Sequence, residues 1–270
     1  MPDPLAARRL LRAYGIRPRK KLGQNFIIDR EALDEILLAA ELGGTETIVE
    51  VGAGLGALTR RLSVAAARVI AIEHDARLIP VLRAVLEGVD NVDVVHGDAL
   101  TIELATPDGF QVVANIPYTI TSAMMRRFLE AGQPPRRMVL TVQSEVAQRA
   151  AAKPGEMSLL ALSVQIYGVP EIRGNIPARA FYPKPEVNSS ILRIDIHGNP
   201  VIEAEWIAPV FQLARAGFAQ RRKKLRNSLG PVLGKAASET LDVAGIDPSA
   251  RAQALSVEDW EGLAKAVKFI

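Results

Sequence analysis

Between residues 47 and 143, short apolar segments alternate with segments of helical periodicity, and this alternation restricts the fold more than any other feature of the sequence. Strands separated by helical crossovers pair in parallel, with helices on both faces of the sheet. We therefore predict an α/β fold with a doubly wound, mostly parallel, Rossmann-like sheet. The predicted strands are Thr47 to Val51, Arg68 to Glu73, Val92 to His96, Gln111 to Asn115 and Arg137 to Gln143, and the predicted helices are Pro4 to Tyr14, Arg30 to Leu42 with Asp29 as N-cap, one from Ala57, Ala76 to Leu86 and Ser122 to Ala131.

The alternation stops after residue 143. Two β-type runs, Val169 to Asn175 and Ser189 to Ile196, are expected to pair antiparallel at a sheet edge. The segment Phe181 to Pro185 between them is too rich in proline for a strand interior. The predicted helices in this part of the chain are Ser144 to Ala151, Ser158 to Tyr167, Glu203 to Phe218, Lys223 to Leu229, Lys235 to Ala244 and Val257 to Lys268.

The turn His197 to Pro200 is followed only by helical patterns. At 270 residues the chain is long enough for a large domain and a smaller one. We predict an α/β domain over residues 1–199, which includes a basic N-terminal segment 1–28, and a small all-helical domain over residues 200–270.

Basic residues gather in two segments that contain no acidic residue. Seven lie between Arg8 and Lys21 and six between Arg215 and Arg226, so that 13 of the 33 Lys and Arg residues occupy two short stretches. Such clusters are typical of phosphate contacts, although each could also be a solvated basic face. The candidate RNA-binding residues are Arg19, Lys20, Lys21, Arg221, Arg222, Lys223 and Lys224.

The composition indicates a globular protein of a reducing compartment. Hydrophobic residues make up 49% of the chain and charged residues 23%, which argues against disorder. No segment approaches the roughly 20 apolar residues of a membrane span. With no cysteine there is neither a disulfide framework nor a thiolate zinc site, and we expect a cytoplasmic protein.

The first predicted strand runs into a glycine-rich turn and a helix. Glycines allow close approach of a ligand to the backbone, and the helix N-terminus offers free N–H groups. Gly52, Gly54 and Ala57 satisfy the dinucleotide pattern G-x-G-x-x-G/A, and Glu73 follows Gly52 by 21 residues at the end of the next strand. Glu73 suits the ribose hydroxyls of NAD or of S-adenosylmethionine, so this motif leaves both open.

Acidic or amide residues lie at the ends of four successive strands. They are Glu50, Glu73, Asp98 and Asn115. Asp98 is placed to accept a hydrogen bond from an adenine amino group. Carboxylates suit a ligand with a sulfonium and an ammonium better than one with a pyrophosphate, which favours S-adenosylmethionine as cofactor. His74 and His96 lie near this edge, but their spacing supports no metal site.

The segment Asn115-Ile116-Pro117-Tyr118 is the candidate catalytic turn. The side-chain oxygen of Asn115 and the carbonyl of Ile116 are suited to accept hydrogen bonds from an adenine amino group, while Pro117 adds no competing N–H. Tyr118 is suited to stack on the base. Transfer from an activated sulfonium is mostly a matter of positioning, so no general base is required.

These motifs together resemble the ribosomal RNA adenine N6,N6-dimethyltransferases of the KsgA type, which modify two adjacent adenosines near the 3′ end of small-subunit (16S) rRNA. The resemblance covers essentially the whole chain. The motifs that carry it are Leu22 to Asp29, Glu50 to Thr59, Glu73, Gly97 to Ala99, Asn115 to Tyr118, Phe181 to Ser189 and Phe218 to Leu225.

The resemblance implies roles for individual residues. It places Phe181 opposite Tyr118 as the second wall of an adenine pocket, where stacking contributes on the order of 1 to 3 kcal/mol per base. A hydrophobic plug under the proline-rich loop is the alternative for Phe181. Ile27 and Ile116 stand where the family often has Leu, which keeps a similar volume. The implied donor-site residues are Asn25, Ile27, Gly52, Glu73, Asp98 and Asn115, to which the glycine turn adds Gly54.

We thus expect a monomeric methyltransferase that acts on small-subunit rRNA within an immature 30S particle during ribosome biogenesis, without a membrane or a metal. Three alternatives stay open at this point. One is a macrolide-resistance dimethyltransferase of large-subunit rRNA, against which Phe181 to Ser189 and Phe218 to Leu225 argue. The others are a nucleotide-cofactor oxidoreductase and a ribosome-assembly factor whose main role is binding.

Overall fold

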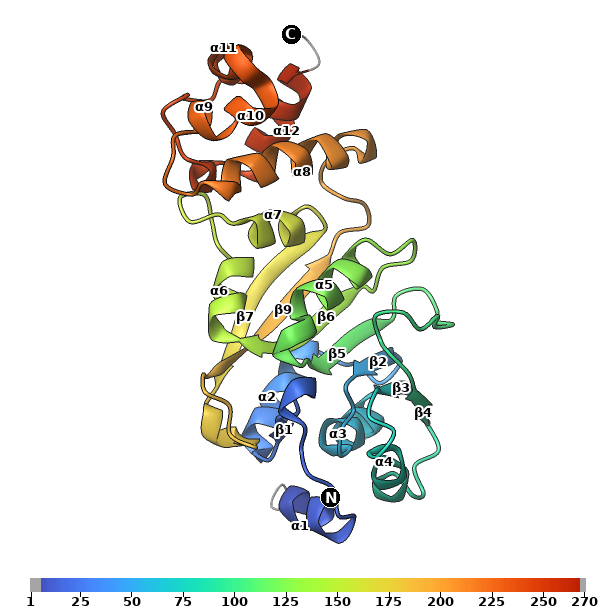
Figure 1. Ribbon diagram of the computed structural model, residues 1–270. Helices are drawn as coiled ribbons and strands as arrows, with labels where there is room; N and C mark the ends of the chain where they lie inside the picture. Colours follow the sequence, from blue (N-terminus) through green and yellow to red (C-terminus); the bar gives the residue numbers. More distant parts are fainter. Residues whose placement is uncertain (1–5, 268–270) are drawn as a thin grey trace. The chain divides into compact units, whose positions relative to one another are not determined.

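The computed structural model describes residues 6–267, which form two compact units (Figure 1). The first unit holds the N-terminal part of the chain up to Ala147 together with Pro170–Ile196, and the second holds Gln148–Val169 and the chain from His197 onward. Pro4 and Lys268, at the ends of the first and last predicted helices, lie outside the described residues, as do the outer ends of the predicted segment 1–28 and domain 200–270. The predicted division at residue 199 stays a prediction.

The first unit is built on a seven-stranded sheet with the order β4-β3-β2-β5-β6-β9-β7. β2 pairs in parallel with β3 and with β5, β3 with β4 and β5 with β6, whereas β9 pairs antiparallel with β6. The predicted doubly wound, mostly parallel sheet is confirmed, and the two late strands lie side by side at one edge. The strands are β2 (Thr47–Val51), β3 (Arg68–Glu73), β4 (Val92–His96), β5 (Gln111–Asn115), β6 (Arg137–Gln143), β7 (Gly168–Ile176) and β9 (Ser189–Ile196).

Helices of the first unit pack on the sheet through apolar residues at helical spacing. Ile36 of α2 and Leu62 of α3 are fully buried and join the same core cluster as Ile48 of β2. α2 starts where the sequence predicts, because the Asp29 carboxylate accepts a hydrogen bond from the Ala32 N–H at 3.1 Å. The helices are α1 (Ala6–Ala13), α2 (Arg30–Ala40), α3 (Ala57–Ala65), α4 (Ile79–Val85), α5 (Thr121–Leu129) and α6 (Ser144–Ala150), the last of which runs into the second unit.

A short two-stranded ribbon joins the N-terminal segment to the proline-rich loop. β1 (Phe26–Ile27) pairs antiparallel with β8 (Phe181–Tyr182), so that Phe26 faces Tyr182 and Ile27 faces Phe181. The sequence predicted no strand at either place. Two residues are too few to show the alternation by which strands are recognised.

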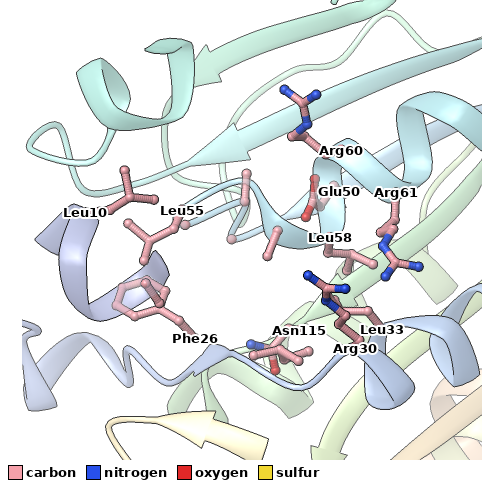
Figure 2. A pocket seen from close by; sticks show the side chains of 16 residues that line it. Leu10, Phe26, Arg30, Leu33, Glu50, Leu55, Leu58, Arg60, Arg61 and Asn115 are labelled. Atoms are coloured by element: carbon pink, nitrogen blue, oxygen red, sulfur yellow. The ribbon is translucent and has the colours of Figure 1, made fainter. Parts of the chain in front are cut away.

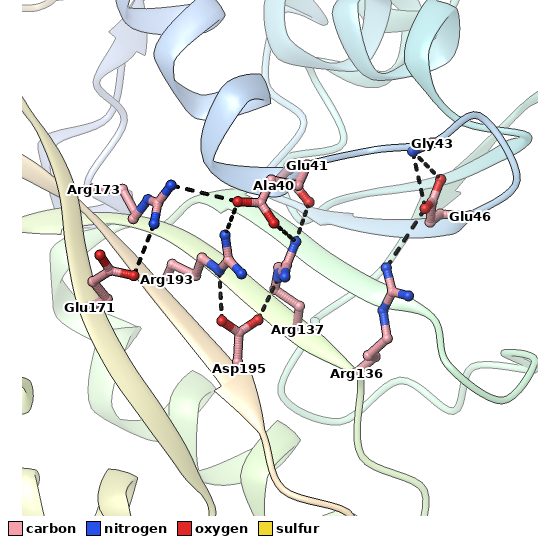
Figure 3. Close-up of polar contacts among 10 residues, drawn as sticks. All are labelled: Ala40, Glu41, Gly43, Glu46, Arg136, Arg137, Glu171, Arg173, Arg193 and Asp195. Atoms are coloured by element: carbon pink, nitrogen blue, oxygen red, sulfur yellow. Dashed lines mark hydrogen bonds and ion pairs between the residues drawn. The ribbon is translucent and has the colours of Figure 1, made fainter.

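Ion pairs connect the C-terminal end of α2 with the amino end of β6 and with β7 and β9 (Figure 3). Asp195 accepts hydrogen bonds from Arg137 at 2.6 Å and from Arg193 at 2.8 Å, and Glu41 pairs with Arg193 at 2.5 Å, Arg137 at 3.2 Å and Arg173 at 3.6 Å. Burial acts to raise the pKa of Asp195, but the two guanidinium groups outweigh it and hold that pKa below its ordinary value. The network holds β7 and β9, at one edge of the sheet, against the end of α2.

The second unit is helical, as predicted for the C-terminal part of the chain. Its core surrounds Trp260, which is fully buried and whose ring lies 5.6 Å from that of Phe218. None of the helices in residues 6–267 is long and apolar enough to cross a membrane. The helices of this unit are α7 (Leu159–Gln165), α8 (Ala204–Ala219), α9 (Leu225–Ser228), α10 (Gly230–Leu233), α11 (Ala237–Val243) and α12 (Val257–Val267), with short 3₁₀ turns η4 (Gly234–Ala236) and η5 (Ala252–Ala254).

Candidate active site

The predicted catalytic turn lies at the carboxyl end of β5, in the middle of the sheet. Asn115 is the last residue of the strand and is half-buried, Ile116 is 2% exposed, and the 3₁₀ turn η2 (Tyr118–Ile120) follows Pro117. The Tyr118 hydroxyl and the Ser189 hydroxyl share a hydrogen bond of 2.8 Å. This contact with the first residue of β9 orients the Tyr118 ring.

A cavity of about 220 Å³ opens at the carboxyl ends of the parallel strands. It is lined from both sides, by the glycine turn after β2 and by the catalytic turn after β5. The structure therefore brings together residues that lie far apart in the sequence, such as Asn25 and Asn115, which are 90 positions apart. The predicted site residues in its lining are Asn25, Gly52, Gly54, Glu73, Asp98, Asn115, Ile116, Pro117 and Tyr118, and Lys21 also lines it.

The glycine turn is held by the carboxylate of Glu73. The Gly54 N–H donates to one oxygen of Glu73 at 2.8 Å, and the Asp75 N–H donates to the other at 2.7 Å. Glu73 is 6% exposed, and burial raises its pKa despite these two donors. Gly54 has φ +59°, and a Cβ there would lie 3.1 Å from the Phe26 ring, so a side chain would be strained and crowded.

Asp98 lies two residues after the end of β4 and lines the larger cavity. Its carboxylate is exposed, and one oxygen accepts a hydrogen bond from the Leu100 N–H at 2.9 Å. A carboxylate oxygen has more than one lone-pair direction, so both Asp98 and Glu73 retain capacity to accept from a ligand.

Figure 2 shows the side chains that line a second, smaller cavity of about 60 Å³. The two share Phe26, Gly52, Gly54 and Asn115. α1, β1, α2 and α3 contribute the other walls, and Ile27 lines this cavity and not the larger one. Ile27 thus lines the smaller cavity, whereas its neighbour Phe26 lines both.

Glu50 lines the second cavity from the end of β2. It is 2% exposed, and its Oε2 has no hydrogen-bond partner among the described residues. Burial raises the pKa of Glu50 to about 8; the Thr59 hydroxyl acts to lower it, and the nearby Glu73 carboxylate adds to the rise. The sequence placed Glu50 among the acids at the strand ends, but its burial could not be read from the sequence.

Phe181 lies in β8 and is 3% exposed within the core cluster that contains Ile27. It lines neither of the two cavities. This position matches the alternative of a hydrophobic plug. The stacking role opposite Tyr118 stays a prediction, and it requires that the ring leave this core.

The candidate RNA-binding residues are solvent-exposed in both units. Arg19, Lys20 and Lys21 lie at and within the 3₁₀ turn η1 (Lys20–Leu22) of the first unit. Lys20 pairs with Glu186 at 3.3 Å, and both side chains remain about nine-tenths exposed, at 96% and 88%. In the second unit, Arg221, Arg222, Lys223 and Lys224 form the exposed connection between α8 and α9.

Two residues that the sequence did not single out connect the parts of this site. Gln24 lines the larger cavity and donates to the Asp75 carboxylate at 2.8 Å. Asp75 also binds the Arg77 guanidinium, which holds the pKa of that carboxyl well below its usual range. His74 is exposed at the cavity, and no group of three or more His, Asp or Glu residues in the described part of the chain is arranged to hold a metal ion.

A family model described as Ribosomal RNA adenine dimethylase matches residues 15–268. The chain belongs to this family. It is 44% identical over 264 residues to Ribosomal RNA small subunit methyltransferase A of Dehalococcoides mccartyi, covering 95% of this chain and 91% of the relative. It is 38% identical over 280 residues to the protein of that name from Geobacillus thermodenitrificans, covering 98% and 96%.

Two solved structures of methyl-transferring enzymes have the same fold. The 23S rRNA methyltransferase ErmE superposes with a TM-score of 0.74 at 31% identity, covering 90% of this chain and all of that chain. A dimethyladenosine transferase from Plasmodium falciparum gives a TM-score of 0.74 at 24% identity, covering 88% and 95%. The predicted family and its cofactor, S-adenosylmethionine, are confirmed by this membership. An oxidoreductase is excluded as the activity of the chain.

The residues around the two cavities fit S-adenosylmethionine. The larger cavity offers carboxylates for hydroxyl and amino groups, and the glycine turn allows close approach. The unpartnered oxygen of Glu50 in the smaller cavity matches a cationic group, because a buried carboxylate without a partner is costly.

Proposed function

We propose that the chain transfers methyl groups from S-adenosylmethionine to N6 of two adjacent adenosines near the 3′ end of small-subunit rRNA, giving N6,N6-dimethyladenosines. The single observation that supports this most is the cavity in which the glycine turn, Glu73 and Asp98 meet the turn Asn115 to Tyr118. One wall is suited to a nucleoside with a cationic tail, and the other is suited to a planar amino group.

On the donor side, Glu73 would accept from ribose hydroxyls and Asp98 from an adenine amino group. Glu50, with Arg30 at the same small cavity, would hold the ammonium and carboxylate of the amino-acid end. When bound, the donor supplies a methyl group already activated by the positive sulfur. The chain therefore has to position two groups and does not have to generate a strong nucleophile.

On the acceptor side, the amide of Asn115 donates through Nδ2 to the Asn25 carbonyl at 2.9 Å. Its Oδ1 then remains to accept from the adenine amino group, together with the Ile116 carbonyl. Hydrogen bonds of this kind direct the nitrogen lone pair toward the methyl group. The monomethylated amine still has one N–H, which one of these two acceptors holds while the second methyl group is transferred.

Tyr118 provides a stacking face and not a general base. Burial raises the pKa of its hydroxyl above the ordinary value of 10, and the hydrogen bond with Ser189, which acts in the other direction, does not cancel this rise. The phenol therefore stays protonated at neutral pH. Its ring is held beside Pro117, where a base extruded from an RNA loop needs a surface.

The exposed basic residues would bind the rRNA backbone. Arg19, Lys20 and Lys21 lie next to the cavity on the first unit, and Arg221 to Lys224 lie on the second. Phosphate contacts of this type position a structured RNA without reading its sequence. We propose that the substrate is the rRNA of an immature 30S particle, that the enzyme works as a monomer in the cytoplasm, and that residues 1–199 and 200–270 act as methyltransferase and RNA-binding domains.

The main alternative is methylation of large-subunit rRNA, which is favoured by the similarity to ErmE. The relatives named for the small subunit are more similar in sequence, which supports the first proposal. A mainly assembly-related binding role is the other alternative.

The decisive experiment is transfer of labelled methyl groups to naked 16S rRNA, immature 30S particles, mature 30S particles and 23S rRNA, with the modified nucleotides mapped. We expect N6,N6-dimethyladenosine at two adjacent positions of 16S rRNA and the highest rate on immature particles. Modification of 23S rRNA alone would contradict the proposal. Restoration of assembly by an inactive Asn115→Ala protein would favour the binding role.

A further inference from the structure

Three consecutive residues between η1 and β1, Gly23, Gln24 and Asn25, line the larger cavity. Two of them contact the catalytic turn, and the third contacts the part of the chain that follows β3. Gly23 packs on Pro117, Gln24 donates to Asp75 at 2.8 Å, and the Asn25 carbonyl accepts from Asn115 at 2.9 Å. This segment therefore touches both the donor side and the acceptor side of the site.

The contact on the acceptor side determines which atom of Asn115 faces the substrate. A primary amide offers one oxygen and one NH₂ group, and the two ends exchange when the amide rotates by half a turn. Donation from Nδ2 to the Asn25 carbonyl selects one of these orientations. A displacement of the Asn25 backbone would release this selection.

On the donor side, Gln24 donates to Asp75, and Asp75 in turn donates to Glu73. The Asp75 side chain is 2% exposed and receives Gln24 as well as the Arg77 guanidinium, at 2.9 and 2.5 Å. The backbone N–H of Asp75 donates to Glu73 at 2.7 Å. The Gln24 side chain is therefore two hydrogen bonds away from the carboxylate proposed to bind ribose.

Both ends of the Gln24 amide are engaged. Its Nε2 donates to Asp75, and its Oε1 accepts from the Arg19 N–H at 2.7 Å. The side chain is only partly buried, so these bonds and not packing fix its place.

We propose that Gln24 is a positioning residue of the methyl transfer, which ties the segment over the cavity to Asp75 and thereby fixes Asn115 and Glu73 relative to each other. This inference rests on the proposed function, since it assumes that Asn115 orients the acceptor amine. Gln24 acts through its neighbours and needs no contact with the transferred methyl group. Misplacement by about 1 Å costs on the order of 100-fold in rate, so a loosened segment has a measurable effect.

The test compares Gln24→Met and Gln24→Glu with the control Gln133→Met. Met removes both hydrogen bonds at nearly the same volume, whereas Glu keeps an acceptor for the Arg19 N–H and places a carboxylate against Asp75. Gln133 is an exposed residue of the same unit that donates to Asp108 at 2.7 Å, so the control removes the same type of Gln–Asp bond outside both cavities.

The measurements are kcat at saturating S-adenosylmethionine, KM for this donor, the dissociation constant of S-adenosylhomocysteine and the melting temperature. We expect kcat to fall about tenfold or more in both Gln24 variants, a higher KM for the donor, and, for Gln24→Met, a melting temperature like that of the control. A fall in melting temperature with unchanged kcat would overturn the proposal and leave Gln24 a purely structural residue. A kcat equal to that of Gln133→Met would also overturn it. Absence of methyl transfer by the unmodified protein would instead contradict the proposed function.

Discussion

The side-chain amide of Asn115 donates a hydrogen bond to the backbone carbonyl of Asn25, at 2.9 Å. Asn115 ends a central strand, and Asn25 belongs to the segment before β1, so two distant parts of the chain set the orientation of one amide. The donor end of the amide is used inside the protein. The acceptor end is therefore available to a substrate amino group.

Replacing Asn115 by Ala removes this acceptor. We expect kcat to fall by about 100-fold or more, the range found when one transition-state hydrogen bond is deleted. Binding of S-adenosylhomocysteine should remain measurable, because Glu73 and Asp98 are unchanged. Calorimetry and a labelled-methyl assay measure the two effects separately. An unchanged methylation rate would contradict the role of Asn115.

Gly23→Ala tests the close approach of the segment to the catalytic turn. A Cβ at Gly23 would lie 2.9 Å from Pro117 Cβ, whereas a Cβ at Gly15 would meet nothing within 4 Å. The two glycines have nearly equal φ angles, +62° and +63°, so Gly15→Ala is a matched control for backbone strain. Each variant should lose about 1 to 2 kcal/mol of unfolding free energy from that strain.

Only Gly23→Ala should also lower kcat, because only there is Pro117 displaced. Denaturant unfolding and the methyl-transfer assay, run on both variants, check this expectation. Equal activities of the two Ala variants would show that the segment tolerates a shift against Pro117.

The basic connection between α8 and α9 is tested through salt dependence. Arg221→Ala combined with Arg222→Ala should weaken rRNA binding and reduce the slope of log affinity against log salt by roughly 1 to 2, since each phosphate contact contributes about 0.7 to 0.9. Lys235→Ala combined with Arg251→Ala removes the same charge from exposed positions of the same unit outside the basic segment. If both pairs changed the slope equally, Arg221 and Arg222 would contribute only net charge.

The sequence predicted the seven-stranded sheet and its strands closely, because strand periodicity is a local feature. The pairing of Ile27 with Phe181 was not predictable, since each of these strands has only two residues. The burial of Phe181 follows from that pairing. The sequence left a stacking wall and a hydrophobic plug both open for Phe181, because tertiary packing decides where the ring lies.

The bridge from Gln24 to Asp75 was not predictable either. Its partners are 51 residues apart, and neither type of side chain has a periodic pattern that marks it. The sequence did place Glu50 next to the glycine turn. What it could not show is that one oxygen of this carboxylate is buried without a partner, because burial depends on α1, α2 and α3 together.

Protonation of the Glu50 carboxyl should make both the stability of the fold and the affinity for the cofactor depend on pH. Burial raises the pKa of this carboxyl from 4.5 to about 8, so the folded chain binds a proton that the unfolded chain has released between these pH values. The stability contributed by Glu50 is therefore greatest below about pH 4.5, declines as the pH rises toward 8, and is constant above it. Glu50→Gln cannot ionise and should flatten this decline in urea unfolding measured from pH 5 to pH 8.

The Glu50 carboxyl should also make the affinity for S-adenosylmethionine depend on pH. An ammonium bound beside Glu50 favours its ionised form, so binding of S-adenosylmethionine releases a proton and should tighten as the pH rises from 5 to 8. Glu50→Gln should bind more weakly at pH 8 and lose this pH dependence, whereas Glu87→Gln, an exposed carboxylate on the same unit, should behave like the unmodified protein. Calorimetry in buffers of different ionisation enthalpy measures the released proton directly. Equal affinity of Glu50→Gln and the unmodified protein across this range would place the ammonium elsewhere and leave Glu50 a buried acid of the glycine turn.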